Sequence, residues 1–390
     1  MWKRLAVLVG TAAVVAACGG GSGGSGSEGG GGPIKVGMVG PYSGPVATVG
    51  VAAKEGATAY IKYVNESGGI DGRKIEITSY DDRYTVGETV SSVRRLVQQD
   101  KVVALVSSPV GGPHTQAIAE YAGSKKLPIV GPFQGLPELN AEPTVFPTWA
   151  TIKSQMYAVA DYIYQQKKDS KVAIMYYNDA SGKATKAGVT AAAEANGASV
   201  VADIPFEASA TDLTSEVQKA QSSGADALIM MAGTGQVATA MKTAADLGYS
   251  PQWGGHTTIS DPALSKLAGK AAEGAIGAAI FDTDKADSEE MTRFYDLMEK
   301  YFPGSTPTSF NLSGYTGAVL LVEALRQVKG DITGPNLTKA LESGKTFDVG
   351  TLPGLTYEPG DHVGNPLVRV VTIKDGSVKT LTDWISADGS

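Results

Sequence analysis

The sequence of 390 residues contains a single cysteine, Cys18, and only three histidines. One cysteine excludes a disulfide within the chain, because a disulfide needs two thiols. The histidines, His114, His256 and His362, are far apart, and no pair has the short helical spacing of a zinc site. We therefore expect no disulfide framework and no bound metal, and we predict no cofactor.

Positive charge is also in short supply, since 33 Lys and Arg residues face 40 Asp and Glu residues and the net charge is -7. A nucleic-acid partner requires a basic surface, which this balance does not favour. From residue 34 onwards the sequence contains no G-x-S-x-G, no H-E-x-x-H and no Walker motif. Asp81 and Asp82 are not expected to form an acid–base pair, because neighbouring strand residues point to opposite faces.

A membrane-spanning helix needs about 20 apolar residues, and the apolar run at residues 5–17 is too short for one. This run follows a charged N-terminus and ends directly before Cys18, so residues 1–17 are predicted to be a signal peptide. The segment resembles the lipobox of bacterial lipoproteins, which implies cleavage before Cys18 and lipidation of its thiol. The alternative is an ordinary secretory cleavage site. Residues 18–33 are mostly Gly and Ser and are predicted to be a flexible tether.

These features indicate an exported protein that is anchored by lipid to the membrane, on its extracytoplasmic side. Beyond the tether, short apolar strands alternate with amphipathic helices, which predicts an α/β fold with parallel sheets. A single sheet would need too many strands, so we expect two doubly wound parallel-sheet lobes with a cleft between them. Residues 145–148 are expected to begin the second series of strands. Asp375 and Gly376 predict a hairpin near the C-terminus.

Residues 102–113 illustrate how such a lobe would bind a ligand. A Val-rich strand runs directly into Ser107 and Ser108 and then into a helix. Parallel sheets bind ligands at the carboxyl ends of their strands, beside helix N-termini that favour polar or anionic atoms. The alternative is that the two serines only cap the helix.

Residues 233–238 fit the dinucleotide-binding pattern G-x-G-x-x-A between a strand and a helix. This pattern is the main argument for an alternative function, an exported oxidoreductase. However, the next predicted strand ends at residues 254–256 without the acidic residue that would hold a ribose hydroxyl. A tight strand-to-helix turn is therefore the favoured interpretation.

Four stretches occur in an order that resembles one family: residues 35–45, 65–75, 106–108 and 271–274. The set resembles the extracellular solute-binding proteins of branched-chain amino acid type ABC transporters, which have the type I periplasmic-binding-protein fold. The resemblance extends from residue 34 to the end of the chain. It implies a binding protein rather than an enzyme, which delivers a small molecule to an ABC permease. A ligand sensor of the same fold is the alternative.

The resemblance also implies two lobes that are joined by three crossovers and close on a ligand. Lobe 1 would comprise residues 34–150 and 280–358, and lobe 2 residues 151–279 and 359–390. In relatives that bind α-amino acids, lobe 1 hydroxyls hold the carboxylate, and an acidic residue and an aromatic residue lie on lobe 2. Ser107 and Ser108 match the hydroxyl site.

Three positions depart from that amino-acid site. Gly135 stands where a Thr is expected, Ser181 where a Tyr is expected, and His256 where an ammonium-binding Glu is expected. Several aromatic residues at predicted strand ends suggest instead a flat or apolar ligand with a carboxylate or amide, although an amino acid-like ligand remains open. A His256 that is protonated or donates a hydrogen bond would suit an acid better than an ammonium group, whereas His114 is expected on a helix surface. The candidate ligand-binding residues are Tyr42, Ser107, Ser108, Pro109, Val110, Phe133, Gln134, Trp149, Ser181, Gly233, Thr234, His256 and Phe281.

Overall fold

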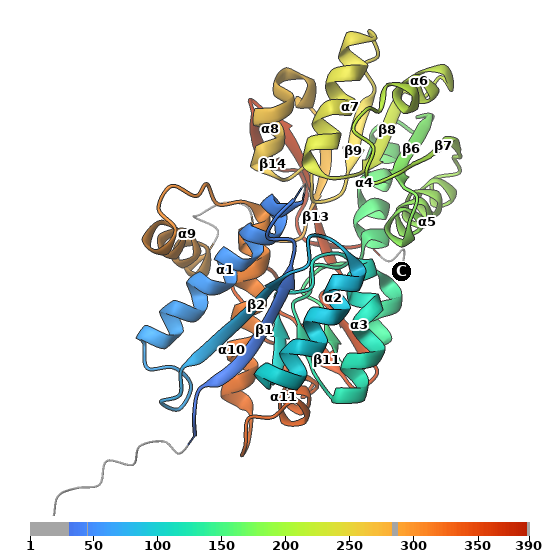
Figure 1. The fold of residues 1–390 in the computed structure, drawn as a ribbon. Helices are drawn as coiled ribbons and strands as arrows, with labels where there is room; N and C mark the ends of the chain where they lie inside the picture. The colour runs from blue at the N-terminus through green and yellow to red at the C-terminus, as the bar shows by residue number, and fades with distance from the viewer. Residues whose placement is uncertain (1–30, 45, 283–287, 388–390) are drawn as a thin grey trace, which may run out of the picture.

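The computed structural model describes residues 31–44, 46–282 and 288–387, which form two α/β lobes (Figure 1). The predicted signal peptide, Cys18 and most of the tether lie outside these residues. Within the described ranges, no helix combines the length and apolar character needed to cross a membrane. The predicted fold class, with parallel sheets covered by helices, is confirmed.

The first lobe contains a five-stranded parallel sheet in the order β2-β1-β3-β4-β5. Its strands are β1 (Ile34–Gly40), β2 (Ile75–Asp81), β3 (Ala104–Val106), β4 (Ile129–Val130) and β5 (Val145–Phe146). The expectation that residues 145–148 begin the second series is wrong, because β5 pairs with β4 in this first sheet. A strand of two residues is too short for its sequence pattern to indicate which strand it pairs with.

Helices cover both faces of this sheet, and three of those in the first lobe come from late in the sequence (Figure 1). They are α1 (Ala47–Glu66), α2 (Val86–Arg95) with the π-helical turn Leu96–Asp100, α3 (Gly112–Lys125), the 3-10 turn Pro137–Ala141, α9 (Glu289–Tyr301), α10 (Ser309–Gln327) and α11 (Gly334–Leu341). The sequence had not predicted α11.

The second lobe contains a longer mixed sheet in the order β14-β13-β10-β9-β8-β6-β7, with β15 paired to β13. Its strands are β6 (Val172–Tyr177), β7 (Val200–Phe206), β8 (Ala227–Met231), β9 (Gln252–Gly255), β10 (Ile276–Ala279), β13 (Leu367–Lys374), β14 (Ser377–Thr380) and β15 (Ile385–Ser386). Its helices are α4 (Ile152–Gln166), α5 (Ala180–Ala195), α6 (Thr214–Ser222), α7 (Thr234–Asp246), α8 (Pro262–Ala268) and the 3-10 turn Gly269–Ala272. The hairpin at Asp375 and Gly376 is confirmed, since β13 and β14 pair antiparallel on either side of it.

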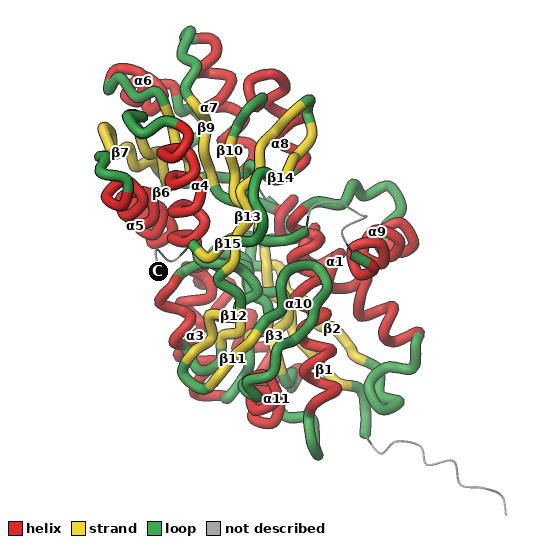
Figure 2. Tube along the Cα trace, turned by 180° about the vertical axis from the view of Figure 1, so that it is seen from behind, coloured by secondary structure: helices red, strands yellow, loops and turns green. Residues whose placement is uncertain are grey.

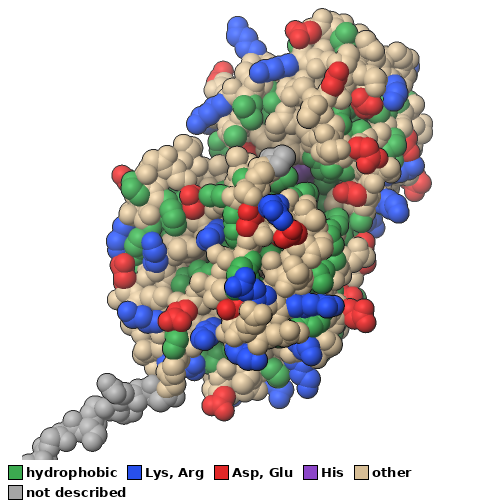
Figure 3. All heavy atoms as spheres, in the orientation of Figure 1, with side chains coloured by type: hydrophobic (Ala, Val, Ile, Leu, Met, Phe, Trp, Pro, Cys, Tyr) green, Lys and Arg blue, Asp and Glu red, His purple; other side chains and the backbone are tan. Residues whose placement is uncertain are grey.

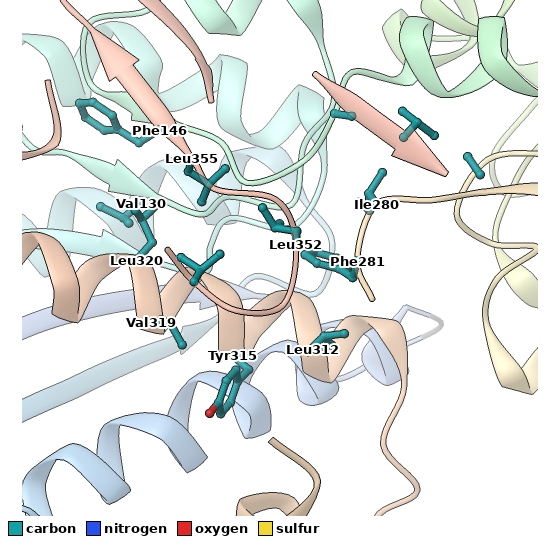
Figure 4. Close-up of a cluster of buried hydrophobic side chains, with 14 of the residues drawn as sticks. Val130, Phe146, Ile280, Phe281, Leu312, Tyr315, Val319, Leu320, Leu352 and Leu355 are labelled. Carbon is teal, nitrogen blue, oxygen red and sulfur yellow. The ribbon is translucent and has the colours of Figure 1, made fainter. Parts of the chain in front are cut away.

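The chain passes between the lobes after β5, after β10 and after a small hairpin, β11 (Thr356–Glu358) and β12 (Asp361–Gly364). Figure 2 shows from behind that β13 and β15 lie where the lobes meet. Residues of both lobes belong to one buried apolar cluster. Figure 4 shows part of it, where Leu312 of α10 lies near Phe281 and Tyr315 points from the same helix toward α1.

Candidate functional site

The carboxyl ends of strands from both sheets border the hollow between the lobes, where Figure 3 shows a histidine side chain. Two observations show that the lobes meet at one edge of this hollow. Ala180, at the start of α5, packs against the apolar cluster behind the first sheet. Helix α3 of the first lobe also packs against α5 of the second lobe. The site is therefore built from loops of both lobes.

The two serines after β3 have different roles. Ser107 has a positive φ of 48°, and its hydroxyl donates to the carbonyl oxygen of Gly314 in α10 at 2.6 Å. Ser108 is 1% exposed, and its Oγ has no hydrogen-bond partner in the described part of the chain. The capping alternative is wrong, because the N-cap of α3 is Gly111 and no side chain caps this helix. A buried hydroxyl without a partner is costly unless a ligand or water completes it.

The next two strands of the sheet, β4 and β5, are also followed by buried polar side chains. Gln134 follows β4 and is buried, and its Oε1 accepts from the N–H of Leu136 at 2.6 Å. Within the described ranges, its Nε2 and the Oγ1 of buried Thr148 have no partner. Thr148 follows β5, so the strands β3, β4 and β5 each lead to an uncompensated polar atom. These polar atoms are donors of the kind that a carboxylate accepts from.

An apolar cluster lies beside these polar groups. Val110, Phe133 and Ala53 are buried together, and Val49, Trp149 and Phe310 pack against them. The Phe133 and Trp149 rings are 5.7 Å apart, and Trp149 lies edge-on to Phe281 at 6.5 Å. The structure thus brings together three of the four aromatic residues that the sequence singled out. Sequence reasoning missed Val49, Ala53 and Phe310, because they lie on helices rather than at strand ends.

Tyr42 borders the same cluster. A Cβ added to Gly40 would lie 3.4 Å from Val110 and 3.5 Å from the Tyr42 ring, so the two side chains are neighbours. Asp81 fixes this loop, since its carboxylate accepts from the N–H of Tyr42 at 2.8 Å and from the hydroxyl of Ser43 at 2.5 Å. Burial would raise the pKa of Asp81, but these hydrogen bonds outweigh it and the pKa is lowered. Asp81 therefore positions Tyr42, rather than acting as an acid or base.

His256 occupies the other side of the hollow as a neutral ring. Its Nε2 lies 2.7 Å from Oγ1 of Thr258, and that hydroxyl donates its proton to the carbonyl oxygen of Ala232 at 3.0 Å. The ring must therefore donate from Nε2, while Nδ1 accepts from the N–H of Thr258 at 3.3 Å. Burial lowers the pKa of His256 to about 4. At neutral pH this pKa disfavours the protonated form of His256, and a neutral ring that donates a hydrogen bond to an acid stays a prediction.

This shift has a consequence for stability. The unfolded ring titrates near pH 6.5 and the folded ring near 4, so the unfolded chain binds more protons between these values. The free energy of unfolding is therefore expected to fall by about 2 kcal/mol as the pH drops from 6.5 to 4, less than full burial would give because the ring is partly exposed. Urea unfolding at several pH values measures this loss.

His256→Gln is the matched variant, because an amide can replace both hydrogen bonds without titrating. Its stability should depend less steeply on pH over this window than that of the unaltered protein. His114, whose pKa burial also lowers, remains in both proteins and cancels in the comparison. Equal slopes in the two proteins would contradict the assignment to His256.

The remaining second-lobe candidates form a tightly bonded turn. The N–H of Gly233 donates to the Tyr177 hydroxyl at 2.8 Å, and the hydroxyl of Thr234 donates to Asp261 at 3.0 Å. Because the Gly233 N–H is already engaged, this turn does not present it to a pyrophosphate. Ser181 is buried in the first turn of α5. Tyr177, which sequence reasoning missed, supplies an aromatic residue four positions before Ser181.

The other two histidines are buried among protein side chains. The expectation that His114 is on the surface is wrong, since it is 3% exposed and its Nδ1 lies 2.8 Å from the hydroxyl of Thr89. His362 is buried and stacks on Phe146 with ring centroids 4.3 Å apart. Among the residues that the structure describes, no cluster of three or more His, Cys, Asp or Glu side chains is placed to hold a metal ion.

A pocket continues from the aromatic residues toward the hinge. It is lined by Thr257, Ser260 and Pro262 of the second lobe and by Phe294 and Leu312 of the first lobe. Phe281 and Asp282, which follow β10, also line it. The pocket therefore spans the junction that must deform if the lobes move.

The chain is similar to known proteins over most of its length. Residues 33–377 match the family described as periplasmic binding protein. The chain is 24% identical over 351 residues to the Leu/Ile/Val-binding protein homolog 3 of Brucella melitensis, covering 88% of this chain and 92% of that one. It is 25% identical over 243 residues to the Leu/Ile/Val-binding protein of Escherichia coli, covering 62% of this chain and 66% of that one.

Solved structures are similar over nearly the whole chain. A branched-chain amino acid ABC transporter protein of Thermus thermophilus with bound valine superposes with a TM-score of 0.84 at 21% identity, covering 92% of this chain and 98% of that one. A fatty acid ABC transporter substrate-binding protein of Thermomonospora curvata gives a TM-score of 0.82 at 22% identity, covering 92% and 93%. At these identities the likeness concerns the fold.

Proposed function

Because the chain belongs to the periplasmic binding protein family, we propose that it captures a small carboxylate with an apolar body for an ABC permease. The resemblance to solute-binding proteins of branched-chain amino acid type transporters is confirmed by the family match and by the relatives. These relatives are substrate-binding proteins. The nature of the ligand and the delivery to a permease are the proposal.

The observation that carries the proposal is the uncompensated hydroxyl of Ser108 beside the apolar cluster. Ser108 is buried without a partner in the described residues, and Val110, two residues further along the chain, pairs with Phe133. A carboxylate oxygen that accepts from this hydroxyl would remove its desolvation cost. The apolar part of the same ligand would bury its surface against Phe133, Trp149 and Val110.

The two solved structures described above agree with this chemistry. One contains valine and the other belongs to a fatty acid transporter. Valine and fatty acids share a carboxylate and an aliphatic body, and they differ in the α-amino group. In this chain the expected ammonium-binding position is the neutral His256, which supports a ligand without an α-amino group.

Ligand capture would act through the relative population of open and closed forms. A ligand that touches Ser108 on one lobe and the Thr234 or His256 region on the other stabilises the closed form, because only that form makes both sets of contacts. We also propose that lipidation of Cys18 keeps the protein at the extracytoplasmic face of the membrane, where a permease can recognise the closed form.

A panel of matched acids tests the proposal. Leucine, 4-methylpentanoate, 4-methylpentanamide and 3-phenylpropanoate separate the amino group, the carboxylate and the aromatic ring. A carboxylate without an amino group is expected to raise the melting temperature most, because a ligand at 100 times its Kd adds about 2.7 kcal/mol of stability. Thermal unfolding followed by calorimetric titration measures this effect.

Two other outcomes would contradict a ligand without an α-amino group. If leucine binds more tightly than 4-methylpentanoate, an acidic side chain holds the ammonium group, and Asp179→Asn should remove that preference. Asp179 is the acid to change because it is the N-cap of α5, next to Ala180, which packs on the first lobe. If no member of the panel raises the melting temperature, the proposed ligand class is wrong.

A further inference from the structure

The backbone of Tyr84 has a conformation that is uncommon for a non-glycine residue. Tyr84 follows Arg83, and the two residues have positive φ angles of 58° and 49°. Two successive non-glycine residues in the left-handed region cost free energy, and such strain persists only where surrounding contacts impose it. The side chain is nevertheless 40% exposed. The loop therefore holds an aromatic side chain outward at a cost.

Two carboxylates impose this turn. Asp82 is fully buried and accepts from the N–H of Tyr84 at 2.9 Å and from the hydroxyl of Thr89 at 2.8 Å. Asp81 accepts from the N–H of Arg83 at 3.0 Å. Since Asp81 also fixes Tyr42, the Asp81–Asp82 pair positions both first-lobe tyrosines of the hollow.

One face of the Tyr84 ring is supported by the first lobe. The ring lies against His114 with centroids 4.6 Å apart. His114 is held in turn by Thr89 at 2.8 Å, so the carboxylate of Asp82, Thr89 and His114 form a buried network under the ring. A Cβ on Gly111 would lie 3.2 Å from the Tyr84 hydroxyl. These contacts fix the direction in which Tyr84 points.

The second lobe lies opposite. Helix α5 of the second lobe packs against α3 of the first lobe, and the Tyr84 hydroxyl lies beside Gly111 at the start of α3. Although one side of the Tyr84 ring is open to solvent, its burial in the hollow, together with the nearby Tyr177 and Asp179, raises its pKa to about 12. Asp179 caps α5 through the N–H of Gly182 at 3.0 Å, and Ala180 next to it packs on the first lobe. Tyr177 is itself fixed by the N–H of Gly233. Hydrogen bonds within the second lobe therefore hold both Tyr177 and Asp179 in place.

We propose that Tyr84 is the first-lobe half of a latch that closes on Tyr177 and Asp179. This inference rests on the proposed function, because the latch holds the closed form around the ligand. Its phenol ring provides contact area at low cost in conformational entropy, and its hydroxyl is a donor for the Asp179 carboxylate. The latch lengthens the residence time of the ligand without contributing to the initial encounter, since the open form does not make these contacts.

Tyr84→Ala and Tyr84→Phe test the latch, with Val86→Ala as the control. Val86 lies two residues away, is 38% exposed and starts α2. With the panel acid that binds best as the probe, stopped-flow Trp fluorescence should show about a tenfold faster dissociation for Tyr84→Ala and a smaller increase for Tyr84→Phe. The association rate should change less than about twofold, and Val86→Ala should match the unaltered protein. Equal dissociation rates for Tyr84→Ala and Val86→Ala would overturn the proposal.

A double-mutant cycle assigns the partner. If Tyr84 acts on Asp179, then Tyr84→Phe should have little further effect on dissociation in an Asp179→Asn background. Additive effects would overturn the assignment to Asp179.

A measurement without ligand separates the latch from the proposed ligand class. Fluorophores on cysteines introduced at exposed Ser91 and Gln221, one on each lobe, with Cys18→Ser, report the distance between the lobes. Single-molecule energy transfer should show that Tyr84→Ala increases the population with the longer distance. An unchanged distribution would overturn the latch even if the ligand panel succeeds. A shifted distribution would support the latch even if no panel member binds.

Discussion

Replacing Gly56 with alanine should lower the free energy of unfolding by roughly 3 kcal/mol or more, although alanine normally stabilises a helix. Gly56 lies in the middle of α1, and a Cβ there would be 1.8 Å from the carbonyl oxygen of Asn311 in α10. The facing Gly314 is equally constrained, since its Cβ would be 2.0 Å from the carbonyl oxygen of Ala53. The two helices approach through these glycines, so the new methyl group must push them apart. Urea unfolding measures the loss.

Gly123→Ala provides the matched control. Gly123 is a helical glycine of α3, and a Cβ there would meet nothing within 4 Å. Alanine at this position should stabilise the protein by about 0.5–1 kcal/mol, because it restricts the unfolded chain and favours the helix. Equal stability of the two variants would contradict the packing argument.

The Gly56 variant should also weaken ligand binding. Ala53 of α1 and Phe310 of α10 both belong to the apolar cluster of the candidate site. Separation of the two helices would displace these side chains relative to Phe133. The close helix contact therefore shapes the ligand site in addition to stabilising the first lobe.

Replacing Ser108 with alanine should weaken the binding of a carboxylate ligand by about 1–3 kcal/mol, or about 5- to 150-fold. The hydroxyl is buried without a partner in the described residues, so its removal costs the ligand-free protein no hydrogen bond. The free energy of unfolding without ligand should therefore stay the same or rise slightly. Calorimetric titration with the best acid of the panel, together with urea unfolding, measures both quantities.

Ser107→Ala is the matched comparison, because it removes the same hydroxyl oxygen from the adjacent serine. Ser107 donates to the carbonyl oxygen of Gly314, so its loss should lower the free energy of unfolding by about 1 kcal/mol. Its effect on ligand affinity should be smaller than that of Ser108→Ala. If Ser108→Ala keeps full affinity, the hydroxyl does not contact the ligand and the proposed site is wrong.

The features that the sequence predicted correctly depend on local patterns. Alternating strands and helices follow from hydrophobic periodicity, which each segment carries independently of its partners. The C-terminal hairpin follows from Asp375 and Gly376, whose positive φ angles of 52° and 69° suit a tight turn. The family resemblance rests on short motifs in order and predicted the same fold.

The site could be predicted only in part. Strand ends identified Ser108, Phe133 and Trp149, because in a parallel sheet these ends face a common edge. Phe310 was not identifiable in this way, since it reaches the cluster from α10, which is more than 150 residues further along the chain. Burial of His114 was also unpredictable, because it depends on a network with Thr89 and Asp82 that forms only when three segments meet.

The sequence by itself determined the α/β class, the position of Ser107 and Ser108 after a buried strand, and the departures at Gly135, Ser181 and His256 from an amino-acid site. Only the tertiary structure decided which of the two serines lacks a hydrogen-bond partner among the described residues and that His256 is neutral. The physical reason is that local patterns fix how each segment folds, whereas hydrogen-bond completion and desolvation depend on neighbours from distant parts of the chain.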